Sequence, residues 1–365
     1  MKAYIILFIC VTILNIINEK YFLKSNRKFL KILLFGISIW LLCFVAGMRN
    51  VTVGTDVNVY VSRLFNISIN SSGVIDYLKN SNSDILFALT VYIGSIFKDI
   101  NHALFLIEFM VAFPIFIYAY KESPKKSFTY LVLIFLLTMY CISLNLMRQS
   151  IAMSICILSY HYFNKKEYKK AYILLFVACL FHKTALIFVM VYLINYVINN
   201  SKKYKLIYIL GIVAGSVLAT IFMEKIVVLT SYASYIDRSS LIRDFSINSI
   251  LKKVFWIFLA CFATIFVKDD KKKNNLVIGN VLMIISLALT MCSFKIPGTG
   301  RLGYYFLNMS YFLIIPEIPY AFKEKKIIST VLLGIIIFFW FKMTYVENDS
   351  SQVYPYKSEK IEWLN

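Results

Sequence analysis

Residues 276–294 read LVIGNVLMIISLALTMCSF, a run of 19 residues without a charged side chain. As a helix with a rise of 1.5 Å per residue it would be about 28 Å long, close to the ~30 Å hydrocarbon core of a bilayer. Its apolar positions do not alternate with polar ones, as they would in a strand of a transmembrane barrel. The run therefore predicts a helix that crosses a membrane.

Comparable runs fill the rest of the 365-residue chain, which is 60% hydrophobic and 16% charged. Soluble domains are about 45–50% apolar and about 25% charged, and one soluble core stops growing beyond ~250–300 residues. This composition excludes a soluble enzyme, a disordered chain and a DNA-binding domain. The other runs lie at about 3–19, 32–48, 102–120, 128–144, 149–163, 171–181, 184–198, 204–223, 251–267, 302–320 and 327–343, with a weaker run at 84–97.

These runs predict an all-α, polytopic integral membrane protein with about 12 crossings. Runs 171–181 and 184–198 are too short for ordinary spans and meet at His182. They predict a short helical hairpin around that residue. Run 84–97 would be about 21 Å long as a helix, shorter than the bilayer core. It is expected to form a short helix in the outer leaflet, although the sequence leaves open whether it crosses.

Loop charge predicts the orientation of the chain. Six short loops hold 22 Lys or Arg in 47 residues, whereas the remaining loops hold 12 in 96. Cytoplasmic loops of membrane proteins collect Lys and Arg, so the lysine-rich set is expected to face the cytoplasm. The same rule explains the net charge of +20 without a nucleic-acid partner. The lysine-rich loops are 20–31, 121–127, 164–170, 199–205, 268–275 and 321–326.

Both termini are then external. The expected organisation is a single transmembrane domain over residues 1–343, with external loops at 49–83, 224–250 and 295–301. An external tail follows over residues 344–365. All seven cysteines fall inside apolar runs without metal-ligand spacing, so neither a disulfide nor a zinc site is predicted.

Arginine has a different distribution from lysine. The chain has 32 Lys and 7 Arg, and the lysine-rich loops contain a single arginine, Arg27. Guanidinium is a planar fork that binds phosphate bidentately and stays charged. The bias therefore predicts an external anionic ligand, most simply a phosphate or diphosphate. The six external arginines are Arg49, Arg63, Arg148, Arg238, Arg243 and Arg301.

An alternative for some of these arginines is a simple pair with a nearby acid, as for Arg238 beside Asp237. Arg148 is the stronger candidate, because it lies between two apolar runs and charges at membrane depth are usually functional. Arg301 follows a Pro-Gly-Thr-Gly turn before the next run. Gln149 follows Arg148 and could bind a sugar hydroxyl.

Two further side chains are candidates for proton transfer. His182 lies in a break between apolar helices, and Asp56 lies at the tip of a Gly-Thr-Asp turn. A lone histidine in a membrane segment can also be a hydrogen-bonded packing residue, and the sequence leaves both interpretations open.

The order of these motifs resembles the EpsG family of bacterial exopolysaccharide proteins, over nearly the whole chain. The resemblance begins with Arg49-x4-Gly-Thr-Asp-x3-Tyr60 and continues with Leu-Met-Arg-Gln-Ser-Ile-Ala over 146–152. Ala-x2-Phe-His-x-Thr-Ala over 178–185, Gly-x-Gly-Arg-x2-Tyr over 298–304 and Pro-Tyr at 355–356 complete it. By motif, the resemblance marks Arg49, Asp56, Arg148, Gln149, His182 and Arg301 as site residues.

EpsG-like proteins are similar to Wzy-type polysaccharide polymerases. The resemblance implies a membrane glycosyltransferase that joins oligosaccharide repeat units carried on undecaprenyl diphosphate, at the outer face of the bacterial cytoplasmic membrane. It also implies chain-length regulator and flippase proteins as partners in the lipid bilayer. The alternatives are a lipid-linked oligosaccharide flippase and a non-catalytic membrane partner of a polysaccharide synthase complex. An O-acyltransferase is disfavoured, because it would need a histidine reachable from the cytoplasm.

The residue types suit such a glycosyl transfer independently of the resemblance. A leaving diphosphate needs its developing negative charge stabilised, and arginines can do this without a metal. No Asp-x-Asp motif lies in the expected external loops, so neither a metal nor another cofactor is predicted. The attacking hydroxyl needs a base at contact distance. Arg49, Arg148, Gln149 and Arg301 are the predicted diphosphate or substrate ligands, and His182 or Asp56 is the predicted base.

Overall fold

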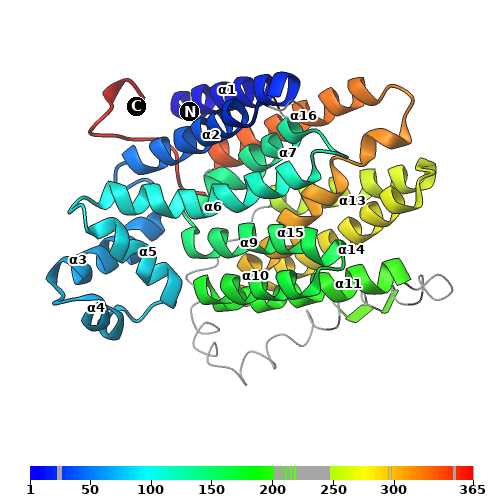
Figure 1. Ribbon diagram of the computed structural model, residues 1–365. Helices are drawn as coiled ribbons and strands as arrows, with labels where there is room; N and C mark the ends of the chain where they lie inside the picture. Colours follow the sequence, from blue (N-terminus) through cyan, green and yellow to red (C-terminus); the bar gives the residue numbers. More distant parts are fainter. Residues whose placement is uncertain are drawn as a thin grey trace. The chain divides into compact units, whose positions relative to one another are not determined.

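A computed structural model describes residues 1–22, 27–200, 247–294, 296, 298–347 and 351–364, with isolated positions 207, 210, 211, 214, 215 and 218. The described residues form helices and contain no β-strand, as Figure 1 shows. The all-α class predicted from the apolar runs is therefore confirmed for the described residues. The expected span at 204–223 and most of the expected loop 224–250 lie outside the described residues.

The described helices are numbered in chain order. In order they are α1 (Lys2–Ile17), α2 (Lys28–Met48), α3 (Arg63–Asn70), α4 (Val74–Ser81), α5 (Ile85–Ser95), α6 (Ile100–Glu122), α7 (Phe128–Phe135), α8 (Cys141–Ser143), α9 (Met147–Asn164), α10 (Tyr168–Phe181), α11 (Val189–Asn200), α13 (Ile247–Phe266), α14 (Asp270–Cys292), α15 (Thr299–Ile314) and α16 (Lys325–Phe341). Short π-helical turns cover Asn18–Phe22, Val57–Ser62, Leu136–Tyr140 and Lys342–Glu347, and 3-10 turns cover Lys183–Phe188, Ile318–Ala321 and Glu362–Leu364.

The contacts group the chain into two compact units. The first unit comprises Met1–Leu186 together with Trp340–Asn365, and the second comprises Ile187–Phe339. The C-terminal residues therefore return to the N-terminal helices, and the two ends of the chain lie near each other in Figure 1. The single transmembrane domain and the separate tail stay predictions.

Seven helices are long and apolar enough to cross a membrane among the described residues, and the twelve predicted crossings are not confirmed. The difference comes from helix length. For example, α10 and α15 have only 14 and 16 residues, or about 21 and 24 Å at 1.5 Å per residue. The weak run at 84–97 forms α5, an 11-residue helix that is also too short to span. The seven candidate spans are Lys2–Tyr21, Lys28–Met48, Ile100–Glu122, Lys183–Asn200, Ile247–Phe266, Asp270–Cys292 and Lys325–Glu347.

Lysine-rich loops gather at one end of the first unit. The Glu19 carboxylate accepts hydrogen bonds from the Ser127 hydroxyl and from the Thr129 N–H, both at 2.9 Å. The ammonium groups of Lys121 and Lys170 both lie over the Tyr162 ring, at 5.2 and 5.4 Å from its centroid. Glu19 thus contacts the end of loop 121–127 and the start of α7, and Lys121 of that loop and Lys170 of loop 164–170 lie over the same ring.

The opposite end of the first unit collects the other loops. The Tyr4 hydroxyl donates to the Val353 carbonyl at 2.9 Å, and the Gly54 N–H donates to the Gln352 carbonyl at 3.1 Å. The N-terminus, the segment after α2 and the C-terminal residues therefore lie together. Which of the two ends faces outward stays a prediction.

A close contact between α5 and α6 fixes the C-terminal end of α5. A Cβ atom added to Gly94 would lie 2.4 Å from the Cα of Ala103, so only a glycine permits this approach. The Tyr77 hydroxyl also donates to the Ala88 carbonyl at 3.0 Å and fixes α5 from the side of α4. These contacts position Asp84, the residue that precedes α5.

Candidate functional site

A polar cluster in the first unit joins three distant parts of the chain. One carboxylate oxygen of Asp84, Oδ2, lies 3.3 Å from a terminal guanidinium nitrogen of Arg148 and 3.3 Å from Nδ1 of His182. We call Asp84, Arg148 and His182 the polar triad. The structure thus brings together two of the predicted site residues through a carboxylate that was not predicted.

Each member of the polar triad lies at the end of a helix. Arg148 is in the first turn of α9, His182 ends α10 in an extended conformation, and Asp84 precedes α5. The His182 carbonyl then accepts from the Ala185 N–H at 2.9 Å, which begins the 3-10 turn Lys183–Phe188. Helix ends expose backbone groups and allow charged side chains to leave the apolar core. The break predicted at His182 is thus present. The expectation that the following run is too short to span is wrong, because Lys183–Asn200 is one of the candidate spans, and the short hairpin stays a prediction.

The Arg148 guanidinium lies over two aromatic rings. Its central carbon lies 4.2 Å from the centroid of the Tyr60 ring and 5.9 Å from that of Phe87. Guanidinium stacks well on aromatic faces, whereas its N–H donors lie in its own plane. The two rings therefore restrict where the Arg148 guanidinium can lie.

Charge and exposure make the polar triad suited to an anionic ligand. Burial acts to raise the pKa of Asp84, but its hydrogen bond with His182 and the charges of His182, Arg148 and Lys183 hold that pKa below the ordinary value. The Asp84 side chain is 9% exposed, whereas those of Arg148 and His182 are 23% and 24% exposed. A ligand can therefore reach the cation and the imidazole, while the carboxylate lies beneath them.

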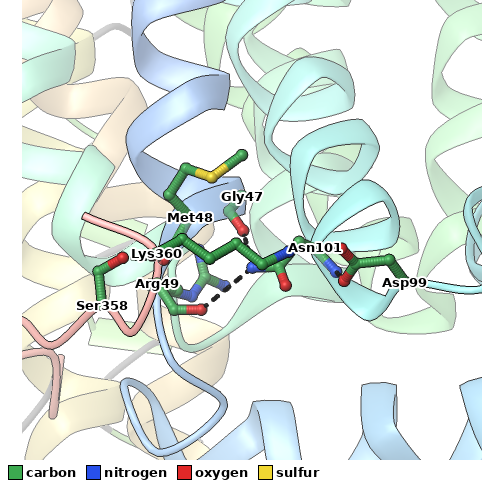
Figure 2. Close-up of polar contacts among 7 residues, drawn as sticks. All are labelled: Gly47, Met48, Arg49, Asp99, Asn101, Ser358 and Lys360. Atoms are coloured by element: carbon green, nitrogen blue, oxygen red, sulfur yellow. Dashed lines mark hydrogen bonds and ion pairs between the residues drawn. The ribbon is translucent and has the colours of Figure 1, made fainter.

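Arg49 has a different environment from Arg148. Its side chain is buried and its guanidinium donates to the carbonyls of Ala46 and Leu144, both at 3.0 Å. Asn101 donates to the carbonyls of Gly47 and Arg49 from the start of α6, as Figure 2 shows. This environment favours a role in holding the end of α2 against the start of α9. A direct contact between Arg49 and a substrate stays a prediction.

Asp56 and Gln149 lie close in sequence to members of this region but make other contacts. The Asp56 N–H donates to Oδ1 of Asn145 at 3.0 Å. Gln149 follows Arg148 on α9 and its side chain is buried. The roles of Asp56 as an alternative base and of Gln149 as a sugar ligand stay predictions.

Arg301 belongs to the second unit. It is exposed in the first turn of α15, which begins after Gly298, a residue with a φ of +89°. Thr299 and Gly300 of the predicted Pro-Gly-Thr-Gly turn thus belong to the first turn of this helix, and Pro297 lies outside the described residues. Arg63 is exposed at the beginning of α3, while Arg238 and Arg243 lie outside the described residues.

The other two histidines have structural partners. Nδ1 of His161 lies 2.6 Å from a carboxylate oxygen of Glu122 at the lysine-rich end of the first unit. The His102 ring stacks on Phe97 with a centroid distance of 4.7 Å. His182 differs from these two histidines because the carboxylate that it contacts, that of Asp84, also pairs with an arginine.

Asp84 was missed because its position has an ordinary explanation. An acidic residue directly before an apolar run is typical of a helix N-cap. The Asp84 side chain makes no capping bond to α5, however, and faces Arg148 and His182 instead. Tyr60 stood inside the predicted motif, but nothing in its spacing from Arg148 indicates that their side chains meet.

Possible metal ligands and cysteines do not cluster in the part of the chain that the structure describes. No group of three or more His, Cys, Asp or Glu there could hold a metal ion. All seven cysteines are free thiols. The polar triad offers one carboxylate and one imidazole, which is too few ligands for a protein zinc site.

The fold and the polar triad define a multi-pass helical membrane protein with an arginine–carboxylate–histidine cluster at helix ends. The model of the EpsG family matches residues 32–358, nearly the whole chain. The chain therefore belongs to the EpsG family, as its motifs predicted, and is an exopolysaccharide-related membrane protein. Neither a curated protein nor a solved structure matches it significantly.

Proposed function

We propose that this protein polymerises lipid-linked oligosaccharide repeat units during exopolysaccharide or capsule biosynthesis. The glycan would be transferred from an undecaprenyl diphosphate donor at the outer face of the bacterial cytoplasmic membrane. The observation that supports this proposal is that Arg148 and His182 both contact the carboxylate of Asp84. This arrangement combines a cation for a leaving group with a base for a nucleophile.

The proposed step is a displacement at the anomeric carbon of the donor. A hydroxyl oxygen of the acceptor sugar forms the new bond, while the bond to the diphosphate oxygen breaks and the diphosphate leaves with the electron pair. The hydroxyl proton moves to Nε2 of His182. Nδ1 of His182 faces Asp84 at 3.3 Å, so a proton on Nδ1 would be shared with the carboxylate and Nε2 would be the basic nitrogen.

Arg148 would stabilise the departing diphosphate. Guanidinium carries five N–H donors. Its ion pair with Asp84 uses one terminal nitrogen, and the remaining donors would bind phosphate oxygens. Its contact with the Tyr60 ring and its ion pair with Asp84 hold the guanidinium in place, so its donors would need little reorganisation as charge develops. Arg301 is proposed as a second cationic contact, and Arg49 as a residue that supports the site from beneath.

The two alternative functions make different demands on the polar triad. A flippase would need a cationic path for the diphosphate but no proton acceptor, so the Asp84–His182 pair favours an enzyme. A non-catalytic partner of a synthase would need neither. The proposed partners are the undecaprenyl diphosphate-linked oligosaccharide, the bilayer, and the chain-length regulator and flippase of the same assembly.

The proposal can be tested in cells whose only copy of the protein carries His182→Ala. Polymer should disappear and the lipid-linked single repeat unit should accumulate on the outer face, where a membrane-impermeant lectin or periodate can reach it. Arg27→Lys is the matched control and should make normal polymer. Accumulation of the repeat unit on the inner face alone would instead support a flippase.

A further inference from the structure

The C-terminal residues are buried and hydrogen-bonded to the rest of the first unit, which an external tail would not require. We call residues 351–364 the tail. Val353 is 0% exposed and Tyr356 is 2% exposed, and the Tyr356 hydroxyl donates to the Val45 carbonyl at 3.0 Å. The Ser358 hydroxyl donates to the Met48 carbonyl at 2.7 Å, as seen beside α2 in Figure 2. The tail is therefore fastened to the end of α2.

The tail also holds the segment that follows α2. We call residues 49–56 the motif loop. The Asn50 N–H donates to the Lys357 carbonyl at 2.7 Å, and the Gly54 N–H donates to the Gln352 carbonyl at 3.1 Å. The Thr55 hydroxyl donates to the side-chain oxygen of Gln352 at 2.6 Å. Gln352 thus fixes the tip of the motif loop through both its backbone and its side chain.

One route leads from the motif loop to Arg148 through Asn145. Oδ1 of Asn145 accepts from the Asp56 N–H at 3.0 Å, and Nδ2 of Asn145 lies 3.5 Å from the same Gln352 oxygen. Asn145 stands three residues before Arg148, and its carbonyl accepts from the N–H of Met147 at 2.9 Å. A shift of the loop tip would therefore reach the first turn of α9.

A second route leads through Tyr60. The motif loop continues directly into the π-helical turn Val57–Ser62, whose Tyr60 ring stacks on the Arg148 guanidinium at 4.2 Å. Gly54 keeps the loop against the α9 side, since its φ is +88° and an added Cβ would lie 2.8 Å from the Leu144 carbonyl oxygen. Both members of the Tyr60–Arg148 stack thus depend on the position of the motif loop.

We propose that Gln352 is a positioning residue that sets the stack of Arg148 on Tyr60 by holding the tip of the motif loop. Its consequence for turnover rests on the proposed function, whereas its consequence for the geometry of Arg148 does not. Because Tyr356 and Ser358 fasten the tail to α2 independently, loss of the Gln352 side chain leaves the tail attached.

Chemical modification of the purified full chain with phenylglyoxal tests the geometry. Gln352→Ala should raise the rate at which Arg148 is modified by roughly three- to tenfold, the equilibrium change that one ordinary hydrogen bond supplies. Quantitative mass spectrometry of the Arg148 peptide gives that rate, with Arg27 as the internal reference. An unchanged rate at Arg148 in Gln352→Ala overturns the proposal.

Three further full-chain variants separate positioning from general damage. Gln352→Glu keeps an oxygen that accepts from Thr55, and should restore the wild-type rate. Lys357→Ala should also react like wild type, since Lys357 contributes its backbone carbonyl. Thr55→Val removes the same hydrogen bond from the loop side, together with the 3.3 Å contact of the Thr55 hydroxyl with Oδ1 of Asn145. It should therefore raise the rate at least as much as Gln352→Ala, even if the latter folds poorly. A wild-type rate in Thr55→Val contradicts the proposal.

Activity provides a separate readout. If the proposed function holds, Gln352→Ala lowers the turnover of lipid-linked repeat units and Gln352→Glu recovers it, while the thermal unfolding midpoint stays near that of wild type. If wild type itself makes no polymer but Gln352→Ala still exposes Arg148, the proposed function fails and the positioning role stands. If Gln352→Ala polymerises repeat units as fast as wild type, the proposal that Gln352 supports the reaction by positioning Arg148 is wrong.

Discussion

At the scale of single residues, substitution of His182 tests whether this residue accepts a proton or only packs against its neighbours. His182→Ala should lower the rate of polymerisation by about 10²–10⁴-fold, the usual worth of a positioned base, while lipid-linked substrate still binds. His182→Gln should not recover the rate, since an amide can form a hydrogen bond but cannot take up a proton. Near-normal turnover in His182→Gln would mean that His182 only positions its neighbours, and Asp56 would become the better candidate.

Arg148→Lys tests whether the planar fork matters beyond its charge. Lysine keeps the positive charge but loses both the bidentate geometry and the stacking on Tyr60. We expect Arg148→Lys to lose most activity with its thermal unfolding midpoint nearly unchanged, and Arg301→Lys to behave likewise. Arg27→Lys, at the lysine-rich end, is the matched control. Equal tolerance of all three substitutions would show that the arginine bias has no functional meaning.

The lowered pKa of Asp84 gives a pH prediction with a definite sign. A carboxylate whose folded pKa lies below its ordinary value of about 3.9 stabilises the fold above that value, and loses this contribution as the pH falls further. The difference in unfolding midpoint between wild type and Asp84→Asn should therefore stay constant from pH 8 to about pH 5 and shrink below about pH 4. A difference that already shrinks between pH 8 and pH 6 would contradict the lowered pKa of Asp84.

The same substitution checks the reaction. Asp84→Asn keeps an oxygen for Nδ1 of His182 but removes the charge, and a hydrogen bond to a charged group is worth about 1.5–3 kcal/mol. The polymerisation rate should fall by roughly 10- to 100-fold on that basis. Because Asp84 stays ionised above pH 5, any loss of wild-type activity between pH 8 and pH 5 must come from another group.

Sequence reasoning identified Arg148 and His182 but not what connects them. The bias toward arginine and the break at His182 are visible in the order of residues. The contact through Asp84, in contrast, requires α5 to lie against α6 and α10, which depends on packing rather than on local pattern. Arg49 is a second example of a feature that the sequence does not reveal. Its place in the motif does not indicate that its side chain is buried, unlike that of Arg148.

At the scale of helices, the contact between α5 and α6 can be tested directly. Gly94→Ala places a methyl group 2.4 Å from the Cα of Ala103, and overpacking of this kind costs about 1–3 kcal/mol of the free energy of unfolding. The unfolding midpoint should fall, and activity should fall with it because α5 carries Asp84 at its start. Gly36→Ala on α2, where nothing lies within 4 Å, should leave the midpoint unchanged or raise it.

Helix lengths show how far apolar runs predict elements. The runs at 32–48, 102–120, 251–267 and 276–294 correspond to α2, α6, α13 and α14, all of which are candidate spans. The run at 128–144 is helical over Phe128–Ser143, but it contains a π-helical turn at Leu136–Tyr140 and is too short for a span by the same criteria. Hydropathy thus located the helices, whereas the number of crossings depends on breaks and turns that carry no apolar signal.

At the scale of the whole molecule, the orientation in the membrane rests on loop charge. Lys79 on α4 and Lys165 after α9 are both exposed but belong to the two opposite sets of loops. On a background without the seven native cysteines, Lys79→Cys should react with an impermeant maleimide in intact spheroplasts. Lys165→Cys should react only after lysis. The reverse pattern would place the polar triad on the cytoplasmic face and remove the proposed reaction.

The central claim is that the polar triad makes this chain a polymerase by itself. The most direct test is to incubate the purified protein with a radiolabelled undecaprenyl diphosphate-linked repeat unit and to resolve the products by length. We predict a ladder of elongated lipid-linked glycans with wild type, and none with Arg148→Lys or His182→Ala at equal thermal stability. A ladder of equal yield from those two variants would contradict the claim. So would the absence of elongation by wild type that is relieved only when a separate synthase is added.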